Sequence, residues 1–368
     1  MNTKEILYLC TAILSLKKNK SNILKVEEII LNAVNWELFV AFSTGHYILP
    51  ALYINLKQAN LIHLLPKDLV LFMEDITSQN KVRNIRLHSE VLELNMLLKI
   101  NNIQAIFLKG SAHLCLNLYS DYAERMIGDI DLLVAPSEML KVAEILKSVG
   151  YFSRTEFNSY LFDSTKHYPR MCHKDKLIAV EIHKEVIQNV GDRQLNYQII
   201  NQTKQMVNGV FIPSFENLVL HNAMNTQMND KHYLFGKLNL RQQYDLFLLS
   251  FKVDVKQTFT EFYFHELKIV AYLVKTSLIF KNTPTLSFPI NWKTTLVKYR
   301  LRTQIAHQKR FKYINALIYF FAYSAIYINL FFVYLEAPKT RKRLLNKFTD
   351  VVWIRAFIKR NINSMFSH

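Results

Sequence analysis

The stretch that decides the fold is residues 107–134, FLKGSAHLCLNLYSDYAERMIGDIDLLV. Residues 130–134 form an apolar run that predicts a buried strand, and alternate side chains of a strand point to the same face. Asp129 and Asp131 are therefore expected to lie side by side among buried neighbours. Two carboxylates in such a place either bind a cation or raise the pKa of one partner strongly.

A cation site is favoured because a third carboxylate is available. Residues 177–183 alternate as a strand should, and apolar neighbours flank Glu181 within it. Carboxylate oxygens suit Mg²⁺, or Mn²⁺, whose remaining positions are filled by water and substrate phosphates. Three carboxylates on neighbouring strands favour a two-metal site for phosphoryl transfer. The alternatives are a turn or helix-capping aspartate with a surface one, and for Glu181 a solvent-facing strand position.

The other end of the stretch offers an anion site. A predicted strand over 103–108 passes into a predicted helix over 111–118, and a glycine at this turn allows close approach of the backbone. The start of a helix also presents free N–H groups to a phosphate. The expected nucleotide-binding residues are Lys109, Gly110, Ser111 and Arg125. The alternative for the lysine and the arginine is plain surface charge.

The stretch resembles the DNA polymerase β-type nucleotidyltransferase superfamily, whose signature is a hydrophobic residue, Gly and Gly or Ser, followed by Asp, a hydrophobic residue and Asp or Glu. More closely, it resembles a bacterial family of uncharacterised nucleotidyltransferases that reads LKG, Tyr, Arg and GDIDLLV. The resemblance covers roughly residues 30–250. The matching residues are Trp36, Arg83, Asn84, Lys109, Gly110, Tyr119, Arg125, Gly128, Asp129, Asp131, Glu181, His183, His221 and Asp245.

The resemblance implies metal-dependent transfer of a nucleoside monophosphate from an NTP, with ATP as the default, to an acceptor, with release of pyrophosphate. By position, Gly110 and Ser111 would hold the triphosphate. Asp129 and Asp131 would bind the metal, and Glu181 would be the third carboxylate. The spacer of 17 residues between the phosphate turn and the first aspartate is longer than in the broad superfamily, although the closer family shares it. The acceptor is therefore left open.

Other polar residues are expected to play supporting parts. His183 and His221 are expected to be interior histidines rather than ligands or bases. Arg241 and Asp245 are four residues apart, which predicts an ion pair on one helix face.

Composition sets the class of the protein. Half of the 368 residues are apolar, while only seven are glycine and eight proline, which favours a mainly helical protein over a sandwich or barrel. Cys10, Cys115 and Cys172 form no CxxC pair, which is typical of reduced thiols in a cytosol. Residues 6–16 have helical spacing and are followed by lysines, which indicates an amphipathic helix rather than a signal peptide. We expect a cytoplasmic protein.

The predicted fold class is α+β, a small polymerase β-like nucleotidyltransferase core with a mixed sheet, flanked by N- and C-terminal helical regions. The helical region over 1–100 includes one long helix, and the core spans 101–212. Within the core, a helix over 136–151 is expected to have Ser137 as its N-cap and Gly150 after its end. Residues 213–290 form helices that pack on the core, and 291–368 a basic helical segment.

The basic segment carries most of the net charge of +17. From residue 296 onward there are 14 Lys or Arg against two acids. Residues 314–335 contain no charge, so they could span a bilayer, lie at its surface or be buried. More basic residues follow this stretch than precede it, which argues against spanning, and a buried helix is expected.

The expected partners are an NTP and the acceptor, with 296–368 as the region for peripheral membrane contact. No aromatic and basic recognition motif accompanies the charge, so nucleic acid is not favoured. The alternative function is a catalytically inactive protein of the same fold that docks on a membrane surface or nucleic acid through its basic helices. The sequence leaves the oligomeric state open.

Overall fold

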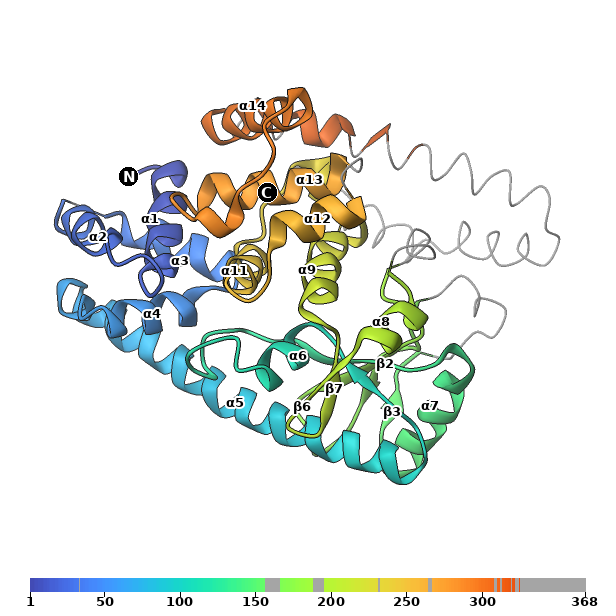
Figure 1. The fold of residues 1–368 in the computed structure, drawn as a ribbon. Helices are drawn as coiled ribbons and strands as arrows, with labels where there is room; N and C mark the ends of the chain where they lie inside the picture. Colours follow the sequence, from blue (N-terminus) through green and yellow to red (C-terminus); the bar gives the residue numbers. More distant parts are fainter. Residues whose placement is uncertain are drawn as a thin grey trace. The chain divides into compact units, whose positions relative to one another are not determined.

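The computed structural model describes residues 1–307 except 33, 156–165, 188–194, 231 and 264–266, and then residues 310, 311, 313–318, 320, 321 and 324. The chain divides into two compact units. The first contains Met1–Lys231 and Leu238–Lys298, and the second contains His232–Lys237 and Tyr299–His368. Figure 1 labels the helices and strands.

The N-terminal part of the first unit is helical, as predicted. It contains α1 (Thr3–Ser15), α2 (Asn22–Leu31), α3 (Trp36–Gly45), α4 (Leu49–Gln58), a short 3-10 helix (Ile62–Leu64) and α5 (Lys67–Ile100). A capping box between Asn2 and Glu5 begins α1, whose apolar side is buried. The predictions of an amphipathic first helix and of one long helix are both confirmed.

A mixed sheet of seven strands forms the core, in the order β3-β4-β5-β2-β1-β7-β6. The strands are β1 (Ile106–Phe107), β2 (Asp129–Leu133), β3 (Phe152–Ser153), β4 (Met171–Cys172), β5 (Ala179–His183), β6 (Gln205–Val207) and β7 (Val210–Ile212). The central strand β2 is parallel to β5 and antiparallel to β1. The mixed α+β class is confirmed, as are the three predicted strands.

Three helices within the core connect these strands: α6 (Lys109–Cys115), α7 (Met139–Ser148) and α8 (Tyr197–Thr203). The prediction that Ser137 caps a helix is wrong. A 3-10 turn, Pro136–Glu138, precedes α7, which begins at Met139 without a side-chain cap. Pro136 favours this tighter turn because its φ is fixed. Gly150 follows the helix with a φ of +93°, as predicted.

Helices return after β7. The first unit continues with α9 (Phe215–Met224), a π-helix (Asn225–Asn229), α11 (Leu240–Leu249), α12 (Val255–Tyr263), α13 (Leu267–Ile279) and a 3-10 turn (Pro284–Leu286), and α10 (His232–Phe235) belongs to the second unit. Figure 1 shows α9, α11, α12 and α13 gathered together, with α9 running toward the sheet. The rings of Tyr244, Phe247 and Phe280 stack between α11 and the end of α13. The predicted division into four regions stays a prediction.

The last element is α14 (Trp292–Ala306). Most of the uncharged segment 314–335 lies outside the described residues, so the prediction about its environment stays a prediction. Among the helices that the structure describes, none has the length and apolar character needed to cross a membrane.

Candidate active site

The pairing of β2 with β5 brings the predicted carboxylates together. Asp131 lies opposite Glu181, and Leu133 lies opposite His183. Asp131, Glu181 and His183 each offer a ligand atom, and these atoms all lie within 4.8 Å of one another. Asp131 is 2% exposed, whereas the side chain of Asp129 is 30% exposed. A carboxylate pair with an imidazole is a donor set that can hold a divalent cation.

Lys109 brings a positive charge to the carboxylate of Asp131. Its Nζ lies 2.5 Å from Asp131 Oδ1, and His183 Nε2 lies 2.8 Å from the same oxygen. The same nitrogen of His183 is 3.5 Å from Glu181 Oε2. Lys109 reaches this position from the turn between β1 and α6, where its φ is +48°. The buried aspartate thus has two nitrogen partners within the chain.

The two aspartates have opposite pKa shifts. Burial acts to raise the pKa of Asp131, but Lys109 and His183 hold that pKa below its ordinary value. Burial also raises the pKa of Asp129, and the charges of Asp131 and Glu181 raise it further. Asp129 therefore experiences the repulsion that the sequence predicts, whereas Asp131 is compensated.

Gly110 and Ser111 lie where the turn enters α6. A Cβ atom on Gly110 would lie 2.8 Å from Arg125 Nη1 and 2.8 Å from Ile127 Cγ2. The glycine is therefore needed for close packing against Arg125. Ser111 is fully buried, and its Oγ has no hydrogen-bond partner among the described residues.

Arg125 forms a buried ion pair with Asp245 of α11. Its Nε lies 3.1 Å from both carboxylate oxygens, and its Nη2 lies 2.8 Å from Oδ2. The Tyr119 hydroxyl also donates to Asp245. The predicted ion pair of Asp245 with Arg241 is wrong, because Asp245 faces the interior of the unit. Arg241 instead donates to the carbonyl of Met126 at 2.8 Å.

His113 lies beside this ion pair but does not join it as a cation. Its Nδ1 is 3.6 Å from Asp245 Oδ2, which is close enough for an ion pair if the ring were protonated. Burial lowers the pKa of His113 to about 4, and the charge of Arg125 opposes the attraction of Asp245. His113 is therefore neutral near pH 7.

The polar side chains of α5 hold the segment that leads to β2. Asn80 Nδ2 donates to the carbonyls of Ala123 (2.6 Å) and Arg125 (3.1 Å). Asn84 Nδ2 donates to the carbonyls of Tyr122 (2.6 Å) and Arg125 (2.7 Å). Arg83 donates to the carbonyls of Ile127 and Gly128. The Arg-Asn pair of the family resemblance thus has a structural role here.

Three further residues lie near the cluster, and the sequence did not predict any of them to bind the nucleotide. Arg170 Nη2 donates to Gly128 O at 3.2 Å and lies 3.7 Å from Asp129 Oδ2. Lys166 is half-buried, and burial followed by the charge of Lys109 lowers its pKa. His221 is 2% exposed, and its Nε2 has no hydrogen-bond partner in the described part of the chain. No spacing rule could have found the two basic residues, because β4 and the segment before it were not predicted.

A cavity of about 200 Å³ is lined by part of these groups, including the two aspartates of β2. One wall comes from the strand and turn residues, including Lys109, Gly110, Asp129 and Asp131. The facing wall comes from α9, the π-helix, the residue after it and α11, and most of its residues are polar. Its residues are Leu218, His221, Asn222, Asn225, Asp230, Arg241 and Gln242. The cavity therefore combines the two aspartates of β2 with the hydrogen-bonding groups and further carboxylates, Asp230 and Asp245, of the helical part.

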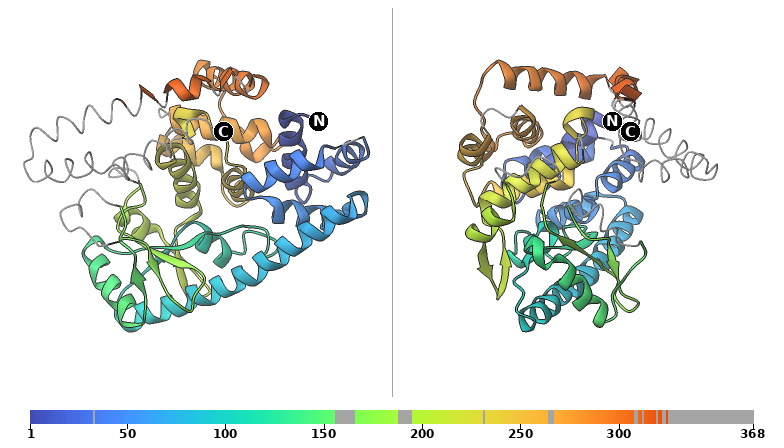
Figure 2. Two further views of the ribbon diagram at one scale, coloured as in Figure 1. Left: turned by 180° about the vertical axis from the view of Figure 1, so that it is seen from behind. Right: turned by 90° about the vertical axis from the view of Figure 1, so that its right-hand side faces the viewer.

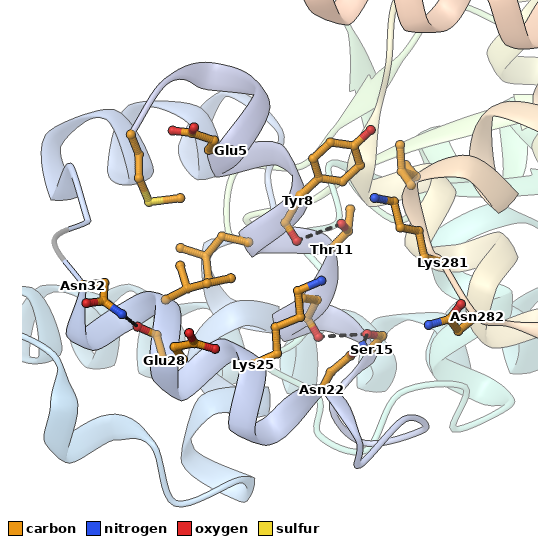
Figure 3. Close-up of a pocket in the computed structure, with 15 residues that line it drawn as sticks. Glu5, Tyr8, Thr11, Ser15, Asn22, Lys25, Glu28, Asn32, Lys281 and Asn282 are labelled. Atoms are coloured by element: carbon orange, nitrogen blue, oxygen red, sulfur yellow. Dashed lines mark hydrogen bonds between the residues drawn. The ribbon is translucent and has the colours of Figure 1, made fainter.

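A larger cavity of about 440 Å³ lies between α1, α2 and the turn after α13 (Figure 3). Several of its polar groups bond to one another or to the backbone. Thr11 Oγ1 donates to the carbonyls of Leu7 and Tyr8, and Asn22 Nδ2 donates to Ser15 Oγ. Those bonds stabilise the two helices. The smaller cavity is the better candidate for chemistry because Asp129 and Asp131 of the carboxylate cluster line it.

The chain is similar to two solved structures, a candidate nucleotidyltransferase from H. pylori and JHP933 from Helicobacter pylori. The first has 13% identity and a TM-score of 0.29 over 59% of this chain and 95% of that chain. The second has 14% identity and a TM-score of 0.25 over 61% and 95%.

No curated protein matches the chain. Residues 32–261 match the family described as uncharacterised nucleotidyltransferases. This match spans more than half of the sequence and contains the whole carboxylate cluster. The chain therefore belongs to the family of uncharacterised nucleotidyltransferases.

Proposed function

We propose that the protein transfers a nucleoside monophosphate from an NTP to an acceptor in a Mg²⁺-dependent reaction that releases pyrophosphate. The observation that carries the proposal is the carboxylate cluster of β2 and β5 in a member of a nucleotidyltransferase family. Its two β2 members, Asp129 and Asp131, line a polar cavity. ATP is the expected donor. The acceptor stays open.

The residues at the cluster fit a divalent cation. Asp131 and Glu181 would hold it, and His183 adds a nitrogen within reach of the same point. Asp129, two residues before Asp131 on β2, would be the third carboxylate. Asp131 is ionised despite its burial, as a ligand must be. The raised pKa of Asp129 reflects repulsion that a cation would relieve. A bound Mg²⁺ would neutralise phosphate charge and lower the pKa of an acceptor hydroxyl.

The protein's own cations would bind the triphosphate. Lys109 contacts both the cavity and Asp131, and Gly110 and Ser111 adjoin it at the turn. Arg170 is half-exposed beside Asp129, so its guanidinium can turn to a phosphate at low cost. Arg125 is held by Asp245, which supports a role in shaping the turn. Its contact with the nucleotide stays a prediction, which the place of Arg125 in the lining of the cavity supports.

The direct test is transfer of label. The purified protein is incubated with each α-labelled NTP, Mg²⁺ and a cell extract, and the labelled product is identified as a small molecule, protein or RNA. We expect one NTP to give labelled product together with pyrophosphate. The matched control is Glu181→Gln, which keeps the shape of the side chain and removes a carboxylate. Absence of transfer with every NTP would favour the inactive, binding-only alternative.

The location and partners outside this site stay predictions. We propose a cytoplasmic protein whose segment 296–368 makes peripheral membrane contact, because the segment combines high positive charge with an apolar stretch. Sedimentation with anionic vesicles at low and high salt tests this contact. We expect binding at low salt that is released at high salt.

A further inference from the structure

The outer face of α5 carries an apolar stripe. Its members are exposed by 40% to 74%, although all are large apolar residues: Val82, Ile85, Leu92, Met96 and Ile100. Figures 1 and 2 show α5 along one edge of the first unit, with α4, α6 and the sheet on its inner side. The inner face already has its own buried residues, including Leu87, Leu94 and Leu98. The outer stripe is therefore additional to the core.

The spacing of the stripe is that of a coiled-coil seam. Residues 82, 85, 89, 92 and 96 follow one another at alternating steps of three and four, and Ser89 is the single polar member. This repeat matches the a and d positions of a heptad. Isolated exposed apolar residues need no explanation, but a continuous stripe marks a surface for another helix.

The charges beside the stripe indicate what that helix is. Arg86 and Glu93 occupy successive e positions, and Lys81 occupies a g position. In a parallel pair of identical helices, Lys81 would face Arg86 of the second copy, and like charges would repel. In an antiparallel pair the e positions face each other, so that Arg86 of each copy faces Glu93 of the other. The e positions are thus complementary to each other in the antiparallel direction, whereas Lys81, which pairs with Asp121 in its own chain, offers no attraction in the parallel direction.

We propose that two copies of this chain associate through antiparallel α5 helices. In this register the small Ser89 lies near Leu92 of the second copy, which gives the leucine room, while Ile85 lies near Met96. The seam over residues 82–96 is about 21 Å long at 1.5 Å per residue. A single helix pair buries less area than a standard stable interface. Association is therefore expected to be reversible and concentration-dependent.

Sedimentation velocity of the full chain over a range of concentrations tests the proposal. We expect a monomer–dimer equilibrium for the wild type. Ile85→Glu should give a monomer, because it places an unpaired carboxylate against the apolar Met96 of the second copy. The matched control is Leu24→Glu on α2, which replaces an apolar residue that is 76% exposed and lies away from the stripe. This control should keep the wild-type equilibrium, and circular dichroism should show that both variants are folded.

A charge exchange tests the direction of the helices. Arg86→Glu alone and Glu93→Arg alone should each weaken the dimer at least tenfold, because each faces like charges. An equimolar mixture of the two should associate again, because every e pair between different variants is then opposite in sign. Glu93 also accepts a hydrogen bond from Lys176 in its own chain, but losing that bond affects only one of the two variants.

Three results would overturn the proposal. The first is a wild type that sediments as a monomer at every concentration. The second is a lower melting temperature for the Ile85→Glu monomer than for the wild-type monomer, which would show that another part of the same chain covers the stripe. The third is a mixture of the two charge variants that fails to associate while the wild type does, because this would exclude the antiparallel pairing.

Discussion

Replacing Asp131 with Asn should destabilise the metal-free protein, although repulsion between paired carboxylates alone predicts the opposite. The structure shows why the sign changes. Asp131 accepts hydrogen bonds from Lys109 at 2.5 Å and from His183 at 2.8 Å, and these contacts hold its pKa low. An amide at this position carries no charge, so the ammonium of Lys109 would lose its ion-pair partner.

The magnitude follows from the burial of the two partners. Removing one partner of a buried ion pair costs about 3–5 kcal/mol. The side chain of Lys109 is 27% exposed, so water can solvate the freed ammonium in part. We therefore expect Asp131→Asn to lower the free energy of unfolding by about 2–3 kcal/mol.

Asp129→Asn is the matched comparison, and its effect should have the opposite sign. The pKa of Asp129 is raised in the folded state by burial and by the neighbouring carboxylates. A raised pKa means that the ionised form costs stability at neutral pH, and that the cost disappears as the pH falls below the unfolded pKa. Asp129→Asn removes this cost, and because the side chain is partly exposed we expect a gain of about 0.5–1 kcal/mol.

Urea unfolding followed by circular dichroism measures both effects at neutral pH in EDTA. Repeating it with Mg²⁺ should stabilise the wild type more than either variant, because a ligand that binds only the folded state adds to its stability. An Asp131→Asn variant as stable as the wild type in EDTA would refute the role given to Lys109. Equal stabilisation of all three proteins by Mg²⁺ would refute the metal site.

Three further predictions concern the surroundings of the cluster. Gly110→Ala should lower the free energy of unfolding by about 1–3 kcal/mol in urea, because the new Cβ would meet two side-chain atoms at 2.8 Å. The control Gly128→Ala should have a much smaller effect, because nothing lies within 4 Å of its Cβ position. Burial depresses the pKa of His113 from 6.5 to about 4, so stability should fall by up to about 3 kcal/mol as the pH drops through that window, and His113→Gln should remove this part of the pH dependence. Arg170→Ala and Lys109→Ala should each weaken NTP binding in calorimetry by about 1–3 kcal/mol, and unchanged affinity in both would show that they are structural or surface charges.

The central elements could be predicted from the sequence because their patterns are local. The apolar run over 130–134 and the alternation over 177–183 are enough to place β2 and β5, and helical spacing over the long segment before residue 100 is enough for α5. The meeting of Asp131 with Glu181 follows from those two strands and from the family resemblance. Strands β3, β4, β6 and β7 have only two or three residues each, which is too short for alternation to distinguish them from loop.

The partners of buried charges could not be predicted, because they come from distant parts of the chain. Arg125 and Asp245 are 120 residues apart, and nothing in the i and i+4 spacing of Arg241 and Asp245 shows which way α11 faces. The contact of Lys109 with Asp131 depends on a positive φ at the lysine, which sequence patterns for ordinary residues do not anticipate. The sequence predicts which side chains lie at the site, whereas only the tertiary fold determines which of them pair with one another.

The segment 119–128 explains why residues far from the carboxylates belong to the same family pattern. Asn80, Arg83 and Asn84 of α5 bind its carbonyls from one side, and Asp245 of α11 binds Arg125 from the other. A buried ion pair is costly to desolvate, so its presence here is better explained by geometry than by stability. Because Asp129 directly follows this segment, holding the segment also fixes where β2 begins. Residues that a motif alone would assign to the nucleotide can therefore have a structural role instead, because they position the strand that carries the proposed metal ligands.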